Sequence, residues 1–223
     1  GATNGAIYAL LGLATVLVFT VTRVIFIPQG EFVAYGALTM AMLQAGKVPG
    51  TVWLLMMLAI LAAVMECWSR WHHDRNLMHG LKSGVVMAIP PLLIAWITVW
   101  AAPQNFPMPV QALLSIAVVA TFGPLVYRIA YQSLESATPL VLLIVSVGVH
   151  FAMTGLGLLF FGAEGFRNPS FLTESWNVGP LNITGQVVII FTTALLLIAA
   201  LWLFFERTLF GKALRATAVN RTG

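Results

Sequence analysis

Ionisable side chains are scarce in this chain, and two of them stand inside long apolar stretches. Glu31 directly follows Pro28, Gln29 and Gly30. Proline removes a backbone donor and glycine relaxes a helix, so we expect a helix break at 28–30. The restarting helix would present free N–H groups, which favour negative charge or polar ligand atoms. An acid at membrane depth costs about 2.5–3.5 kcal/mol on insertion scales, so Glu31 is a candidate for a polar path.

A second interpretation of Glu31 stays open. If the preceding helix ends near Thr22, residues 23–30 form an ordinary short turn. Glu31 would then be a first-turn residue that stabilises a helix N-terminus at the membrane surface. The candidate pathway residues at the break are Gln29, Gly30 and Glu31, with Tyr35 added one turn further on.

His150 is the second candidate. It stands in the middle of the apolar stretch 136–161, four residues after Ser146. A histidine at this place could line a conduit or sense protons. The alternative is a neutral histidine hydrogen-bonded to a neighbouring helix. Ser146 and His150 complete the set of candidate pathway residues.

The remaining polar clusters indicate no catalysis. Glu66 lies near one end of its apolar stretch beside Trp68 and Arg70, which is typical of an interfacial belt with a local ion pair. His72, His73 and His79 flank Asp74, but their spacing matches no compact metal-ligand pattern. The sequence lacks the common signatures of serine hydrolases, zinc proteases and phosphate-binding loops. We therefore expect no catalytic residue, no metal and no cofactor.

The elements that must position these residues are hydrophobic helices. Hydrophobic residues make up 60% of the 223 residues and charged residues 8%, whereas a soluble domain carries about 25% charged residues. The composition predicts an all-α, polytopic transmembrane helical bundle in a lipid bilayer. No basic patch accompanies the aromatic residues, so nucleic-acid binding is not expected. About six to seven membrane segments are expected, one broken near Pro28–Gly30: residues 5–22, 31–46, 51–65 running on to about 68, 84–102, 108–127, 136–161 and 180–205.

Basic residues are distributed unevenly between the two sets of loops. Eight stand at one set of helix ends and two, Lys47 and Arg167, at the other. The positive-inside rule places the first set in the cytoplasm, together with loop 70–83 and tail 206–223. Loop 163–179 then faces outward, and its Gly, Pro, Asn and Ser residues predict a structured surface loop. The eight residues are Arg70, Arg75, Lys82, Arg128, Arg207, Lys212, Arg215 and Arg221.

The C-terminal tail carries the most specific pattern. Residues 211–219 are expected to form a short helix suited to lie against a partner, with Lys212 and Arg215 on one face. Residues 207–216 read Arg-Thr-Leu-Phe-Gly-Lys-Ala-Leu-Arg-Ala. This resembles the Arg-Thr-x-x-Gly-[Arg/Lys]-Ala-x-Arg-Ala signature of the branched-chain amino acid ABC transporter permeases (LivH/LivM type). Residues 4–10, 25–37 and 127–150 are similar to other segments of that family, in the same order.

The resemblance implies a permease subunit and a set of partners. The chain would be an N-terminal portion, with a single transmembrane domain over 1–223, incomplete at its C-terminus, and a cytoplasmic coupling segment at 206–223. A second permease subunit, two ATP-binding subunits and a periplasmic substrate-binding protein would assemble with it in the bacterial inner membrane. ATP would be bound by the partners. The residues implied to contact the ATPase are Arg207, Thr208, Gly211, Lys212 and Arg215.

The implied substrate is a branched-chain or related amino acid. Phe26, Pro28 and Gln29 stand where the family usually has Asn, Ala and His, which leaves a different substrate open. The alternative function is a proton-coupled secondary transporter or channel for a small polar solute such as urea or an amide, in which Glu31 and His150 couple to protons. An internal inverted repeat would favour this alternative, and none is evident in the sequence.

Overall fold

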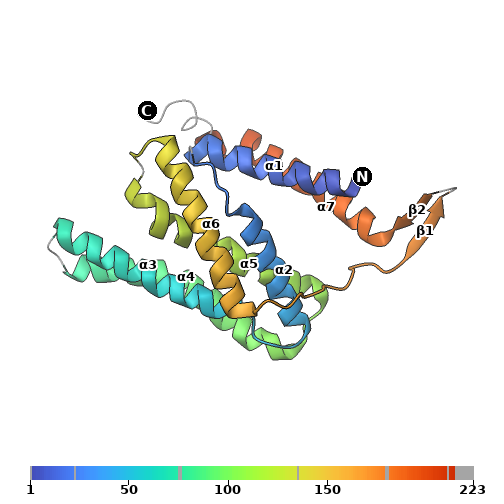
Figure 1. The fold of residues 1–223 in the computed structure, drawn as a ribbon, viewed down its shortest axis with the longest axis horizontal. Helices are drawn as coiled ribbons and strands as arrows, with labels where there is room; N and C mark the ends of the chain where they lie inside the picture. The colour runs from blue at the N-terminus through green and yellow to red at the C-terminus, as the bar shows by residue number, and fades with distance from the viewer. Residues whose placement is uncertain are drawn as a thin grey trace. The chain divides into compact units, whose positions relative to one another are not determined.

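The structure, a computed structural model, describes residues 2–22, 24–74, 77–134, 136–178, 181–209 and 211–213. Most of these residues are helical, which confirms the predicted all-α class (Figure 1). The long helices are α1 (Ala2–Thr22), α2 (Gln29–Gln44), α3 (Gly50–Asp74), α4 (Leu77–Ala101), α5 (Met108–Val126), α6 (Pro139–Phe161) and α7 (Gly185–Arg207). Short helical turns follow α4 and α5: η1 (Ala102–Gln104), η2 (Tyr127–Tyr131) and η3 (Gln132–Leu134).

Within the described residues, 6 helices are long and apolar enough to cross a membrane. They are α1 and α3 to α7, so the chain is a multi-pass membrane protein. Helix α2 has 16 residues, and at about 1.5 Å per residue it is shorter than the roughly 30 Å hydrocarbon core. The predicted number of membrane segments is confirmed, with α2 as the short one. The predicted loop 70–83 is wrong in its bounds, because α3 continues to Asp74 and α4 already begins at Leu77.

The chain divides into two compact units. The first comprises residues 1–29 and 169–223 and contains α1, α7 and a two-stranded hairpin. The second comprises residues 30–168 and contains α2 to α6. The prediction of a single transmembrane domain stays a prediction.

A helix break near the predicted residues 28–30 is present, but of these three only Pro28 lies in it, since Gln29 and Gly30 begin α2. Helix α1 ends at Thr22, α2 begins at Gln29, and the described residues between them, 24–28, are not helical. The backbone N–H of Ile27 donates to the carbonyl oxygen of Ile25 at 3.0 Å, and Pro28 is buried in the turn that follows. Helix α1 has already ended at Thr22, as the short-turn interpretation of Glu31 expected, and Pro28 stands directly before α2, where its missing N–H removes no intrahelical hydrogen bond.

The second unit is held by close helix packing and by hydroxyl hydrogen bonds. A Cβ placed at Gly84 of α4 would lie 2.9 Å from the carbonyl oxygen of Ala63, so α3 and α4 approach at backbone distance. Thr39 of α2 and Thr51 of α3 share a buried hydrogen bond of 2.7 Å. A bilayer offers no water to such groups, and neighbouring helices satisfy them instead. The apolar core includes the fully buried Leu54, Leu55, Val118 and Phe122.

The predicted start of the last span, at residue 180, is wrong. Residues Leu181–Thr184 form strand β2, which pairs antiparallel with β1 (Ser175–Val178), and α7 begins only at Gly185 (Figure 1). Hydropathy extended the span because the strand is itself partly apolar. Gly185 closes the hairpin onto the preceding segment: its N–H donates to the Glu174 carbonyl oxygen at 2.7 Å, and a Cβ there would lie 2.6 Å from Leu172 Cβ.

Candidate functional site

A pocket of about 290 Å³ lies between α2 and the C-terminal half of α6 in the second unit. The segment that follows α6 forms its third side, and there Glu164 lines it. The polar residues of the lining are Glu31, Tyr35, Thr154 and Glu164. Leu38, Met153, Leu158 and Phe161 supply most of the apolar surface. The pocket therefore combines two carboxylates with a mainly apolar wall.

Glu31 and His150, predicted separately, are in contact, but only Glu31 lines the pocket. His150 Nδ1 lies 2.7 Å from Glu31 Oε1, and the two side chains are 35% and 14% exposed. The approach is not directed as a hydrogen bond, and Glu31 Oε2 is buried without a hydrogen-bond partner. Thr154 Oγ1 lies 3.3 Å from Glu31 Oε1 and 3.0 Å from the His150 carbonyl oxygen, so its one proton is shared between them. The carboxylate thus keeps unused acceptor capacity.

Tyr35 fixes α2 against α6 and forms one wall of the pocket. Its hydroxyl donates to the Met153 carbonyl oxygen at 2.5 Å, and the side chain is buried. The ring packs against Phe122 with centroids 5.7 Å apart. A Cβ at Gly157 would lie 3.1 Å from Tyr35 Cε1, which accounts for a glycine at this point of α6. A pathway role for Tyr35 stays a prediction beside this packing role.

Ser146 lies one helical turn before His150 on the same face of α6. It is buried, and its hydroxyl lies 2.8 Å from that of Tyr131 in η2. Ser146 does not line the pocket. Its contact joins α6 to η2, a π-helical turn, and Tyr131 was not among the predicted residues. Such turns add one residue to the helical path and often occur at functional sites.

Gln29 and Gly30 are not among the residues that line the pocket. Gln29 belongs to the first unit, where its side-chain nitrogen donates to the Leu11 carbonyl oxygen at 2.9 Å. Its oxygen accepts from Thr15 Oγ1 at 2.7 Å. Gly30 is exposed, and a Cβ there would meet nothing within 4 Å. Gln29 is therefore bound to α1 within the first unit, and the pathway role of both residues stays a prediction.

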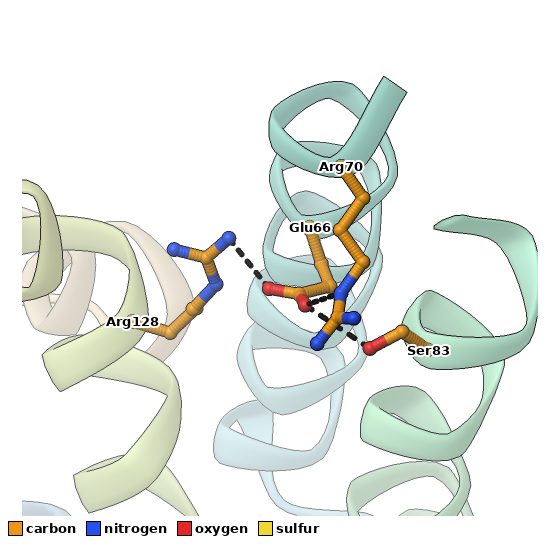
Figure 2. A network of polar contacts seen from close by, with 4 residues as sticks. All are labelled: Glu66, Arg70, Ser83 and Arg128. Atoms are coloured by element: carbon orange, nitrogen blue, oxygen red, sulfur yellow. Dashed lines mark hydrogen bonds and ion pairs between the residues drawn. The ribbon is translucent and has the colours of Figure 1, made fainter. Parts of the chain in front are cut away.

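A second polar cluster surrounds Glu66 near the C-terminal end of α3 (Figure 2). Arg128 Nη2 lies 2.5 Å from Glu66 Oε2, and Arg70 Nε lies 2.6 Å from Oε1. Ser83 of α4 donates to the same Oε1 at 3.0 Å. Glu66 and Arg128 are nearly buried, with side chains 12% and 11% exposed. Figure 2 shows the carboxylate between Arg128 on one side and Arg70 with Ser83 on the other.

The Glu66 cluster extends what the sequence predicted. The local pair with Arg70 was expected, whereas the contacts with Arg128 and Ser83 were not. The cluster gathers the end of α3, the start of α4 and the turn after α5 at one level. This agrees with the grouping of Arg70 and Arg128 on one side of the membrane. That this side faces the cytoplasm stays a prediction.

The described part of the tail shows how α7 ends. The Thr208 hydroxyl donates to the Phe204 carbonyl oxygen at 2.6 Å and accepts from the Gly211 N–H at 2.9 Å. Lys212 N–H donates to the Thr208 carbonyl oxygen at 3.1 Å, which begins a new helical turn. Gly211 is buried, and a Cβ there would collide with the Phe204 carbonyl oxygen and lie 2.6 Å from Phe205 Cα. Arg215 and residues 214–219 of the expected helix lie outside the described residues.

No group of three or more His, Cys, Asp and Glu in the described part of the chain is placed to hold a metal ion. The fold and these clusters define a multi-pass helical membrane protein with buried polar contacts between its helices. Comparisons of the chain with protein-family models, with curated proteins and with solved structures found no match.

Proposed function

We propose that the chain is the permease subunit of an ATP-binding-cassette importer. It would form the solute path in a bacterial inner membrane and couple to separate ATPase subunits, without catalytic residues of its own. The membrane-spanning helices are compatible with a transport subunit. The observation that carries the finer proposal is the Thr208–Gly211 turn, where a basic segment follows the last described span.

The turn gives a physical reason for two residues of the tail pattern. Thr208 satisfies a free carbonyl at the end of α7 and a free N–H of the next turn with one hydroxyl. Gly211 is required because a side chain would collide with the end of α7. Thr208 and Gly211 therefore pack closely against the end of α7, and Lys212 is exposed immediately after them. A firm connection of this kind suits a segment that passes motion from an ATPase to a span.

The remaining parts of the proposal come from the resemblance. The partners would be a second permease subunit, two ATP-binding subunits and a periplasmic substrate-binding protein. Arg207, Thr208, Gly211, Lys212 and Arg215 would contact the ATPase. The substrate would be a branched-chain or related amino acid, or another small solute such as urea or an amide.

Gentle detergent purification of the full-length protein from its native host, with mass spectrometry, tests the assembly. Two ATPase subunits and a second permease should be recovered with it. Recovery of the protein alone, or only with copies of itself, would overturn the importer proposal.

Charge reversal tests the coupling segment. Lys212→Glu should leave membrane insertion normal and uncouple ATP hydrolysis from uptake. Lys47→Glu is the matched control, since Lys47 is also exposed, carries the same charge and lies outside the tail. Full uptake in the Lys212→Glu variant would remove the coupling role from this segment.

A proton-coupled secondary transporter is the second candidate, favoured by the 2.7 Å approach of His150 Nδ1 to Glu31 Oε1. An acid and an imidazole in contact within a membrane are suited to exchange protons. This candidate requires uptake by the protein alone in vesicles, driven by a pH gradient. Uptake that depends on ATP and on partner subunits would exclude it.

A further inference from the structure

We infer that the pocket between α2 and α6 binds the ammonium group of a small solute with an apolar body and disfavours a solute that must bring a carboxylate into it. The inference rests on the proposed function and narrows the substrate left open there: it selects a small amine and excludes the branched-chain amino acids, which carry a carboxylate. It concerns only the second unit, where every residue of the pocket lies.

The charge of the lining selects for a cation. Glu31 and Glu164 contribute two carboxylates, and none of the residues that line the pocket is basic. His150 touches Glu31 from α6, and even a protonated imidazole would offset only one of the two charges. A carboxylate on the solute would meet like charge with no cation to pair with.

Glu31 also has acceptor capacity for a donor-rich group. Its Oε2 is buried without a hydrogen-bond partner, and its Oε1 shares a single hydroxyl proton with a backbone carbonyl. An unpaired buried carboxylate oxygen is costly, so a ligand donor would lower the free energy of the complex once the Glu31 side chain turns to present Oε2 to the pocket. An ammonium group carries three donors and a full positive charge, as the lysine head group does.

The rest of the pocket limits the size and polarity of the solute. A volume of about 290 Å³ lies at the small end of the range for ligand pockets. Leu38, Met153, Leu158 and Phe161 make most of the wall apolar. Tyr35, the polar residue between them, has its hydroxyl committed to the Met153 carbonyl. The pocket therefore suits a short aliphatic amine.

Three solutes with the same branched aliphatic body test the head-group preference. Isopentylamine carries the ammonium group alone, 4-methylpentanoate the carboxylate alone, and leucine carries both. Each is titrated calorimetrically into the full-length protein in detergent, with sodium chloride as the inorganic cation. We expect the amine to bind at least tenfold more tightly than leucine, and the carboxylate and sodium to give no saturable signal. Equal or tighter binding of leucine or of the carboxylate would overturn the inference, as would competition by sodium at equal concentration.

Variants assign the binding to the pocket. Glu31→Gln should weaken the amine roughly ten- to hundredfold, because a charged hydrogen bond becomes a neutral one. Glu174→Gln is the matched control, since it removes the same charge from an exposed acid outside the pocket. If Glu31→Gln lowers the melting temperature, Ala34→Leu provides a second test, because Ala34 lines the pocket and a larger side chain fills it. Amine binding unchanged in both variants would refute the site.

The two proposals fail in different experiments. The titration uses the chain without ATPase subunits, so it tests the pocket alone. Amine binding in a protein that purifies without partners would overturn the importer and leave the pocket standing. Recovery of ATPase subunits by a protein that binds leucine as well as the amine would overturn the pocket alone.

Discussion

The burial of the Glu66 cluster predicts how much stability the protein loses when a residue of the cluster is replaced. Glu66→Gln should destabilise the protein more than removal of either arginine that contacts the carboxylate. Once the charge of Glu66 is removed, the guanidinium of Arg128 has lost its ion-pair partner. The Arg128 side chain is only 11% exposed, and its Nε already lacks a hydrogen-bond partner. Removing one partner of a buried ion pair costs about 3–5 kcal/mol.

The two arginines should differ from Glu66 and from one another. Arg128→Met leaves Glu66 its contacts with Arg70 and Ser83, so the expected loss is smaller, about 1–3 kcal/mol (Figure 2). Arg70 is 47% exposed and pairs with Glu66 along one helix, so Arg70→Met should cost less than about 1 kcal/mol. The expected order of destabilisation is therefore Glu66, Arg128, Arg70.

A double-mutant cycle on the full-length protein measures these differences. Unfolding by a denaturing detergent is followed by tryptophan fluorescence for the wild type, Glu66→Gln, Arg128→Met and the double variant. Both substitutions remove the same contact, the ion pair between Glu66 and Arg128. The free energy of unfolding of the double variant should therefore fall by at least about 1 kcal/mol less than the sum of the two single losses. Additive losses, or an Arg70→Met variant as unstable as Glu66→Gln, would refute the assignment of the buried pair.

Two further predictions concern packing and topology. Gly84→Ala should destabilise the protein by about 1–3 kcal/mol, because a Cβ would lie 2.9 Å from a carbonyl oxygen of α3. Gly148→Ala, with nothing within 4 Å of its Cβ, should be neutral or stabilising by up to about 1 kcal/mol, and the reverse order in thermal unfolding would contradict the packing. In a Cys67→Ser background, Met78→Cys should react with an impermeant maleimide only from the cytoplasmic side and Gly165→Cys only from outside. Exchange of the two patterns would invert the topology.

The spans were predictable because the bilayer constrains them strongly. A helix in hydrocarbon must be long and apolar, and both properties are visible in the sequence. The break before α2 was predictable for a local reason, since Pro28 alters the backbone directly. The start of α7 was not, because residues 181–184 satisfy their backbone by pairing with Ser175–Val178. Hydropathy does not distinguish an apolar strand from an apolar helix.

The candidate site was predictable residue by residue but not as an arrangement. Glu31 and His150 stood out because each is ionisable within an apolar stretch. Their contact joins α2 to α6, and no spacing in the sequence encodes it. Thr154 gave no signal, because threonine is common in apolar helices. Arg128 was assigned to the membrane surface, where arginine is usual, whereas η2 directs it to a buried acid.

The two interpretations of Glu31 can be compared by their energies. It lies in the first turn of α2, as the cap interpretation requires, but its Oε1 contacts α6 and its Oε2 has no hydrogen-bond partner. The carboxylate can therefore act on its own helix only through charge, which stabilises by about 0.3–1 kcal/mol. An acid within the membrane costs about 2.5–3.5 kcal/mol. The stabilisation by the charge at the helix N-terminus is smaller than this cost and offsets only a minor part of it. His150, Thr154 and the proposed ligand donor are left to offset the remainder. A stabilisation by isopentylamine that vanishes in Glu31→Gln would identify the ligand as one of them, whereas an equal stabilisation in both proteins would leave His150 and the helix end to account for the acid.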